Sequence, residues 1–210
     1  MNTADHWNKI YASKSVEMLG WHEVVPQPSL EFISRCQLSK TRLIMDVGSG
    51  ASTLIPFLVA EDYRNLIALD HADEALRKLE ENIPADKRQF VRFINADVIS
   101  SDWLESVDDV ALWHDRALLH FLNDTSDCET YMARLRHLVA KNGFVIIGAF
   151  SIQGASHCSG LPVQRYSEGS LAELFSPDFH LIESRDYLYQ MPSGDTRPFI
   201  YALFQRVNHT

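Results

Sequence analysis

Two glycines follow an apolar run in the segment LIMDVGSGAST, which extends from Leu43 to Thr53. Gly48 and Gly50 permit positive φ angles and let a ligand approach the backbone without meeting a Cβ atom. Asp46, just before them, adds a carboxylate that accepts hydrogen bonds. Small residues at the end of a buried strand are typical of a ligand crevice in an open α/β sheet. The segment therefore predicts a nucleotide or cofactor site.

Two common nucleotide motifs differ from this segment. The dinucleotide fingerprint G-x-G-x-x-G/A requires a small third residue, and Thr53 occupies that position. A phosphate-binding P-loop ends in Gly-Lys-Ser/Thr, which is absent here. The glycines alone therefore leave the ligand open.

A second group of reactive side chains lies in ALWHDRALLHFL, from Ala111 to Leu122. His114, Asp115, Arg116 and His120 are residue types that orient or deprotonate an acceptor molecule. We predict that His114, Asp115 and His120 are catalytic and that Arg116 binds substrate. Structural roles are the alternative: Asp115 caps the next helix, Arg116 pairs with an acidic neighbour, and His120 is a half-buried histidine whose hydrogen bonds are satisfied.

A third group lies in the polar segment 151–167. Long ordered connections often carry functional residues, and we predict that Cys158, Arg165 and Tyr166 bind substrate. A cysteine next to His157 is also compatible with a metal site or an activated thiolate. Zinc takes four ligands, or three and a water, and we find no convincing third ligand, so no metal is expected.

Alternating strands and helices must position these groups. Short, nearly continuous apolar runs are typical of strands buried on both faces of a parallel sheet. Helical patterns separate them, and Gly143 is expected as the left-handed cap of the last one. The expected strands are 41–47, 65–70, 89–97, 109–115 and 143–150, and the expected helices are 52–61, 72–82, 102–106 and 126–141.

The two ends depart from this alternation. Helices are expected at 4–14 and 28–36, and a further helix at 168–175. The runs FHLIESRDYLY and PFIYALFQRV are joined by MPSGDTR, whose turn chemistry predicts an antiparallel hairpin. The predicted fold is a Rossmann-like, doubly wound α/β sheet of seven strands with helices on both faces. We expect one domain over residues 1–210: a helical cap (1–40), a cofactor-binding core (41–150), and an acceptor-side loop with the hairpin (151–210).

The motif D-x-G-x-G at Asp46, Gly48 and Gly50 resembles motif I of the class I S-adenosylmethionine-dependent methyltransferases. Other segments follow the family in the same order, including IALDHADEAL, INADV and LVAKNGFVIIGAF. The terminal hairpin also fits, and the resemblance covers nearly the whole chain. It implies a methyltransferase that uses S-adenosyl-L-methionine and releases S-adenosyl-L-homocysteine.

The resemblance also implies roles for single residues. Asp70 matches the acidic residue that binds both ribose hydroxyls of the cofactor, and Asp97 matches the one that receives the adenine amino group. Taken singly, each has a structural alternative, as a helix cap or an Asx turn. In similar enzymes the segment that holds Trp7, Tyr11 and Trp21 folds over the cofactor; packing against the sheet edge is the alternative. The full expected cofactor set is Trp21, Asp46, Gly48, Gly50, Asp70, His71, Asp97 and Val98.

The sequence does not identify the molecule that accepts the methyl group. An Asn-Pro-Pro-Tyr motif, typical of enzymes that methylate base amines or glutamine amides, is absent after the fourth strand. HDRALLHF resembles a group of small bacterial methyltransferases without indicating an acceptor. Arsenite methylation uses metalloid-binding thiols, and the sequences around the three cysteines give little support for it. A small molecule or a protein side chain is expected, and the alternatives are an NAD-type oxidoreductase and a noncatalytic S-adenosylmethionine-binding scaffold.

The amino-acid composition of the chain indicates which classes of partner to expect. The 210 residues carry 19 Lys and Arg against 28 Asp and Glu, a formal net charge of −9, so nucleic acid is not an expected partner. No window reaches the roughly 18 apolar residues of a membrane span, so no membrane association is expected. Cys36, Cys128 and Cys158 form no CxxC motif and leave one cysteine unpaired in any disulfide scheme. A cytoplasmic protein of unknown oligomeric state fits these features.

Overall fold

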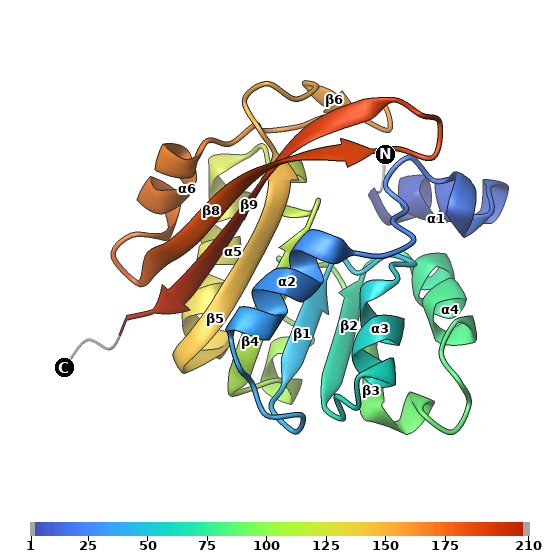
Figure 1. Ribbon diagram of the computed structural model, residues 1–210, viewed down its shortest axis with the longest axis horizontal. Coiled ribbons are helices and arrows are strands. Elements are labelled where there is room, and N and C mark those ends of the chain that lie inside the picture. Colours follow the sequence, from blue (N-terminus) through green and yellow to red (C-terminus); the bar gives the residue numbers. More distant parts are fainter. Residues whose placement is uncertain (1–2, 208–210) are drawn as a thin grey trace.

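The computed structural model describes residues 3–207, in which seven strands form one sheet in the order β3-β2-β1-β4-β5-β9-β8 (Figure 1). Strands β1 to β5 are parallel, and β9 pairs antiparallel with both β5 and β8. This confirms the predicted α/β architecture and the terminal hairpin. The strands are β1 (Ile44–Val47), β2 (Leu66–Asp70), β3 (Val91–Asn95), β4 (Val110–Arg116), β5 (Val139–Phe150), β8 (Phe179–Gln190) and β9 (Thr196–Arg206).

The central strands are buried because helices cover both faces of the sheet. All four residues of β1 are buried, as are all five of β2, which explains why each strand is apolar except for one aspartate, Asp46 in β1 and Asp70 in β2. One core packs the sheet against α2 (Gln27–Arg35), α3 (Leu54–Ala60) and α4 (Asp73–Glu81). The other packs it against α5 (Thr125–Leu138) and α6 (Glu168–Phe175). Polar residues are therefore concentrated where the strands end.

The expected role of Gly143 as a helix cap is wrong. Helix α5 ends at Leu138 and β5 begins directly at Val139, which pairs with Val110. Asn142, not Gly143, has a positive φ, of 58°. A Cβ atom on Gly143 would lie 2.8 Å from the carbonyl oxygen of Ala140. The glycine therefore permits a close backbone approach within an irregular strand.

The segment after β5 contains a small hairpin that the sequence did not predict. Strands β6 (His157–Cys158) and β7 (Leu161–Pro162) pair antiparallel around Ser159 and Gly160. Both turn residues have positive φ angles, 51° and 81°, as a tight two-residue hairpin requires. This turn fixes the position of Cys158.

Helix α1 (Thr3–Ser13) lies beside α4, close to the end of the sheet where β1 and β2 finish (Figure 1). The Lys78 ammonium donates to the carbonyl oxygens of Tyr11 and Lys14, the latter at 2.9 Å. The Glu74 N–H donates to Asn8 Oδ1 at 3.1 Å. These contacts attach the N-terminal helix to α4, which packs against β2 and β3.

Within the described part of the chain, no helix has the length and apolarity needed to cross a bilayer.

We expect Lys78→Met to loosen α1 without unfolding the sheet, because the variant loses both donors to the last turn of that helix. Amide hydrogen exchange of residues 3–13 should accelerate by about tenfold, which corresponds to the loss of roughly 1.4 kcal/mol of local stability. The exposed Lys9→Met is the control. Equal exchange in both variants would show that Lys78 does not anchor α1.

Candidate active site

A cavity of about 340 Å³ opens at the carboxyl ends of the parallel strands. Two groups of side chains line it. The first, here called the cofactor half, consists of Gly48, Leu69, Asp70, His71, Ala96, Asp97, Val98, Ile99 and Leu118. The second, the acceptor half, consists of Phe121, Phe150, Cys158, Leu161, Pro162, Tyr189, Arg197 and Phe199. Trp7, Tyr11, Trp21 and Arg116 also line the cavity.

Asp70 ends β2 and is 8% exposed. Its two carboxylate oxygens accept hydrogen bonds from the backbone N–H groups of Gly50 and Ala72, both at 2.8 Å. Burial raises the pKa of this carboxyl, and the two N–H donors act in the opposite direction. Each oxygen retains a lone pair for a ligand hydroxyl. The carboxylate is thus fixed in position and still able to accept a vicinal diol.

Gly48 and Gly50 have φ angles of 60° and 55°, which confirms the backbone conformation expected of them. A Cβ atom on Gly48 would lie 2.5 Å from Leu118 Cδ1, and one on Gly50 would collide with the Tyr11 hydroxyl. Both positions therefore require glycine because other parts of the chain pass directly over them.

Asp97 follows β3 and closes an Asx turn, in which Oδ1 accepts from the Ile99 N–H at 3.1 Å. Its carbonyl oxygen accepts from Trp103 Nε1 at 3.0 Å. The neighbouring Val98 is buried, and His71 lies next to Asp70 at the same cavity wall. The structure thus brings four of the predicted cofactor residues together in the cofactor half, in addition to Gly48.

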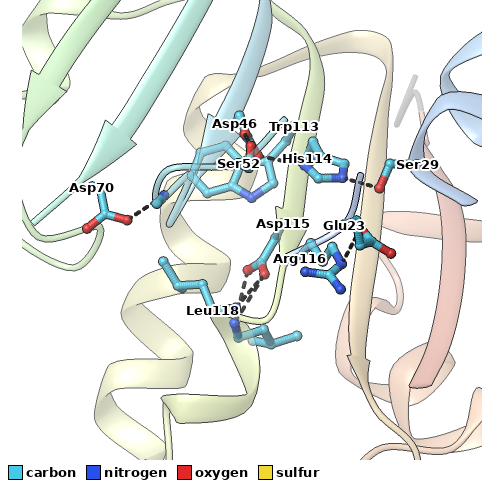
Figure 2. Close-up of polar contacts among 12 residues, drawn as sticks. Glu23, Ser29, Asp46, Ser52, Asp70, Trp113, His114, Asp115, Arg116 and Leu118 are labelled. Atoms are coloured by element: carbon cyan, nitrogen blue, oxygen red, sulfur yellow. Dashed lines mark hydrogen bonds and ion pairs between the residues drawn. The ribbon is translucent and has the colours of Figure 1, made fainter. Parts of the chain in front are cut away.

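Asp46 takes part in a buried network next to the cavity and does not line it. Its Oδ1 lies 2.7 Å from His114 Nδ1, and His114 Nε2 lies 2.8 Å from the Ser29 hydroxyl (Figure 2). The Ser52 hydroxyl donates to the other carboxylate oxygen at 3.3 Å. The network ties β1, β4 and α2 together behind the glycines. Asp46, Gly50 and His114 border a smaller pocket of about 50 Å³, which also meets Trp21 and Arg116.

Asp115 is completely buried and lies outside the lining of the cavity. Its carboxylate accepts from the backbone N–H of Leu118 at 3.0 Å (Figure 2), and also from the N–H of Leu119 at 3.1 Å and the Tyr131 hydroxyl at 2.7 Å. Burial raises the pKa of Asp115 to about 6, although these donors oppose the shift. This geometry shapes the turn after β4, and a catalytic role for Asp115 stays a prediction.

Arg116 stands between the two halves of the cavity. Its Nε lies 2.9 Å from both Glu23 Oε2 and the Tyr201 hydroxyl, and its Nη1 donates to the Trp21 carbonyl at 3.0 Å. The guanidinium also lies 5.1 Å from the Tyr189 ring centroid. Burial raises the pKa of Glu23, and the Arg116 charge opposes that shift. The ion pair with Glu23 therefore fixes the Arg116 side chain at the cavity wall.

His120 is fully buried in the 3₁₀ turn Leu119–Phe121. Its ring lies 4.6 Å from the Phe121 and Phe150 rings, both of which line the acceptor half. Burial, together with the charges of Arg116 and Arg197, lowers its pKa to about 3. The imidazole is therefore neutral near pH 7, and its catalytic role also stays a prediction.

The predicted substrate residues of segment 151–167 separate in space. Cys158 lines the acceptor half, whereas Arg165 is exposed and donates to the carbonyl oxygens of Ile152 and Gly154 at 3.2 and 3.4 Å. Tyr166 is buried in the core that packs against α5 and α6. Neither Arg165 nor Tyr166 lines the cavity.

Aromatic side chains cover the middle of the cavity. The Trp7 ring lies 5.5 Å from Trp21 and 5.2 Å from Phe121, and Tyr11 lies 5.9 Å from Trp21. Tyr11 is 5% exposed, and burial together with the Asp70 charge raises its pKa. The N-terminal segment therefore covers the glycines and also meets the turn after β4.

The sequence did not identify several residues of the acceptor half. Tyr189, Arg197 and Phe199 lie near the tip of the β8–β9 hairpin. Pairing with β5 brings that tip back over the carboxyl ends of the parallel strands. The hairpin was evident from its turn residues, but its alignment against β5 was not. Within residues 3–207, no three His, Cys, Asp or Glu side chains gather in a group that could hold a metal ion.

Comparison with known proteins identifies the fold. No protein-family model matches the chain, and no curated protein sequence does. An S-adenosylmethionine-dependent methyltransferase from Anabaena variabilis ATCC 29413 has a TM-score of 0.78 at 18% identity, over 99% of this chain and 96% of its own. The N-methyltransferase NodS from Bradyrhizobium japonicum WM9, in complex with S-adenosyl-L-homocysteine, has a TM-score of 0.71 at 14% identity, over 99% and 100%.

A third similar structure is 1,6-didemethyltoxoflavin-N1-methyltransferase from Burkholderia thailandensis, which carries 1,6-didemethyltoxoflavin and S-adenosylhomocysteine. Its TM-score is 0.71 at 15% identity, over 98% of this chain and 84% of its own. The chain therefore has the class I S-adenosylmethionine-dependent methyltransferase fold, as the resemblance of its motifs implied.

Replacing Asp115 should destabilise the protein, because Asp115→Ala leaves two backbone N–H groups and the Tyr131 hydroxyl buried without their acceptor. We expect the free energy of unfolding to fall by about 3 kcal/mol. Urea denaturation followed by circular dichroism measures this loss, with the exposed Asp108→Ala as control. Equal stabilities for the two variants would contradict a structural role for Asp115.

Proposed function

We propose that this protein transfers a methyl group from S-adenosyl-L-methionine to a small-molecule or protein side-chain acceptor. The observation that carries the proposal is the continuity of one cavity. Asp70, Asp97 and Gly48 line its cofactor half, and the same space extends past Arg116 into an aromatic acceptor half. Donor and acceptor must share one water-poor space for a direct displacement, and this cavity provides it.

The cofactor half offers the groups that the nucleoside needs. Asp70 retains lone pairs for the two ribose hydroxyls, and Asp97 retains an oxygen for the adenine amino group. Gly48 lets the ligand approach the backbone without a Cβ atom. When bound there, S-adenosylmethionine supplies an electrophilic methyl carbon on a positively charged sulfur. The residues present therefore fit this cofactor.

The remaining residues bind, orient and exclude water. Trp7 and Trp21 cover the cavity between its two halves, where they shield the reacting centre. Arg116, fixed by Glu23, directs its charge toward the same region. The turn held by Asp115 positions Leu118 against Gly48. These contacts align the acceptor with the methyl carbon, which is the main task in a displacement reaction.

The fold neighbours support the proposal. Two of them carry S-adenosylhomocysteine, and the Burkholderia enzyme carries 1,6-didemethyltoxoflavin as well. Of the two alternatives, an NAD-type oxidoreductase agrees less well with Thr53 at the third glycine position, where its hydroxyl donates to the Glu23 carbonyl at 2.9 Å. A noncatalytic binding scaffold would have no use for an acceptor half. The following titration tests the oxidoreductase alternative; a scaffold would bind S-adenosylmethionine in it but would consume none when candidate acceptors are added.

Isothermal titration should show that S-adenosylmethionine and S-adenosylhomocysteine bind and that NAD does not. Asp70→Ala should weaken binding of S-adenosylhomocysteine by about tenfold to a hundredfold, because a charge-assisted hydrogen bond contributes roughly 1.5–3 kcal/mol. Asp73→Ala, an exposed residue in the first turn of α4, should bind as the unmodified protein does. Binding of NAD, or indifference of both adenosyl ligands to Asp70→Ala, would contradict the proposed site.

A further inference from the structure

The acceptor half has an unusual chemical composition. Its lining contains aromatic and apolar side chains, the Cys158 thiol and the Arg197 guanidinium, with no carboxylate and no imidazole. Of the acidic side chains that line the cavity, Asp70 and Asp97 belong to the cofactor half, and Asp127, in the first turn of α5, is the third. The residues grouped as the acceptor half thus present hydrogen-bond donors and no carboxylate of their own.

Arg197 has poor hydrogen-bond acceptors for a partly buried cation. Its Nε donates to Met191 Sδ at 3.0 Å and its Nη1 to Cys158 Sγ at 3.5 Å. Its guanidinium carbon lies 5.5 Å from the centroid of the Phe150 ring. Sulfur is a weak acceptor, and no carboxylate among residues 3–207 lies within ion-pair distance of Arg197. The guanidinium could form two parallel hydrogen bonds with a carboxylate, and no side chain among residues 3–207 provides that partner.

Two further nitrogens of the same region lack partners within the described chain. Arg116 Nη2 is buried without an acceptor, although Glu23 pairs with Nε of the same side chain. The Phe150 N–H donates to His120 Nδ1 at 3.4 Å, so the neutral ring carries its proton on Nε2, which is also buried and unpartnered. Unpartnered donors of Arg116 and His120 thus accompany the weakly bonded guanidinium of Arg197. Arg116 and Arg197 line the cavity, whereas His120 lies behind its aromatic wall, so a ligand that bonds the two arginines must present acceptors.

We propose that the methyl acceptor is a small organic anion with a planar apolar body, and that Arg197 holds its anionic group. The rings of Phe121, Phe150, Tyr189 and Phe199 provide the walls for that body. A guanidinium binds a carboxylate through two parallel hydrogen bonds, which matches the unused donors of Arg197. The inference rests on the proposed methyl transfer, because it names the second substrate of that reaction.

An anionic acceptor also agrees with the lack of a base. In transfer to an anionic oxygen, the bond between sulfur and the methyl carbon breaks and leaves its electron pair on sulfur. The new bond joins the methyl carbon to oxygen, one positive and one negative charge disappear, and no proton has to leave. A half-cavity without carboxylate or imidazole is sufficient for this reaction.

The test compares benzoate with its neutral isostere benzamide, by titration into the protein alone and into the protein saturated with S-adenosylhomocysteine. Benzoate should bind at least about tenfold more tightly than benzamide, the ratio expected for one charge-assisted hydrogen bond. Arg197→Gln should abolish that preference, and Arg197→Lys, which keeps the charge, should retain part of it. Arg206→Gln is the matched control, because Arg206 lies at the other end of β9 and outside the cavity.

Titration of each variant with S-adenosylhomocysteine separates the two proposals. Unchanged cofactor affinity in Arg197→Gln, with the anion preference lost, supports the acceptor assignment. If Arg197→Gln weakens S-adenosylhomocysteine but not methylthioadenosine, which lacks the carboxylate, then Arg197 serves the amino-acid end of the cofactor and the inference is wrong. Equal binding of benzoate and benzamide, or no binding of either, also overturns it. Failure of the unmodified protein to bind S-adenosylhomocysteine refutes the proposed function instead, since benzoate is also titrated into the protein alone.

Discussion

The buried carboxylate of Asp115 is the interaction on which the geometry of the site depends. By accepting from Leu118, Leu119 and Tyr131, it closes the chain into a tight turn directly after β4. That turn presses Leu118 over Gly48 in the cofactor half. It also directs Phe121 toward the acceptor half. The Asp115 carboxylate is tolerated without access to solvent because the Leu118 and Leu119 N–H groups and the Tyr131 hydroxyl all donate to it.

The surrounding elements connect the two halves through aromatic contacts. Trp7 meets Phe121, and Trp21 provides the carbonyl oxygen that fixes Arg116. Lys78 in turn attaches α1 to α4, next to the strand that carries Asp70. The N-terminal segment therefore contacts elements from both sides of the cavity. Because this segment contacts both halves, a displacement of it would change water access to the whole cavity at once.

Much of the fold could be predicted from the sequence, because buried parallel strands and turn residues leave local signals. The strands that end at Val47 and Asp70 were found from apolar runs, and Gly48 from the motif after the first. The polar cluster after β4 was found as well, but residue types do not reveal which side chains turn inward. Arg197 was missed because its place depends on the register between β9 and β5, a long-range pairing that its neighbours in sequence do not determine.

The buried charges of the site explain why the His120 side chain is neutral. A proton on His120 would add a third positive charge near Arg116 and Arg197 in a space that excludes water, and this lowers its pKa to about 3. Glu23 compensates Arg116, whereas Arg197 meets only sulfur atoms and a ring. The acceptor half thus carries the positive charge of Arg197, for which no carboxylate among residues 3–207 provides an ion pair. Binding of the anion proposed above would supply these acceptors, so the groups that are costly to bury in the free protein would be the ones that recognise the ligand.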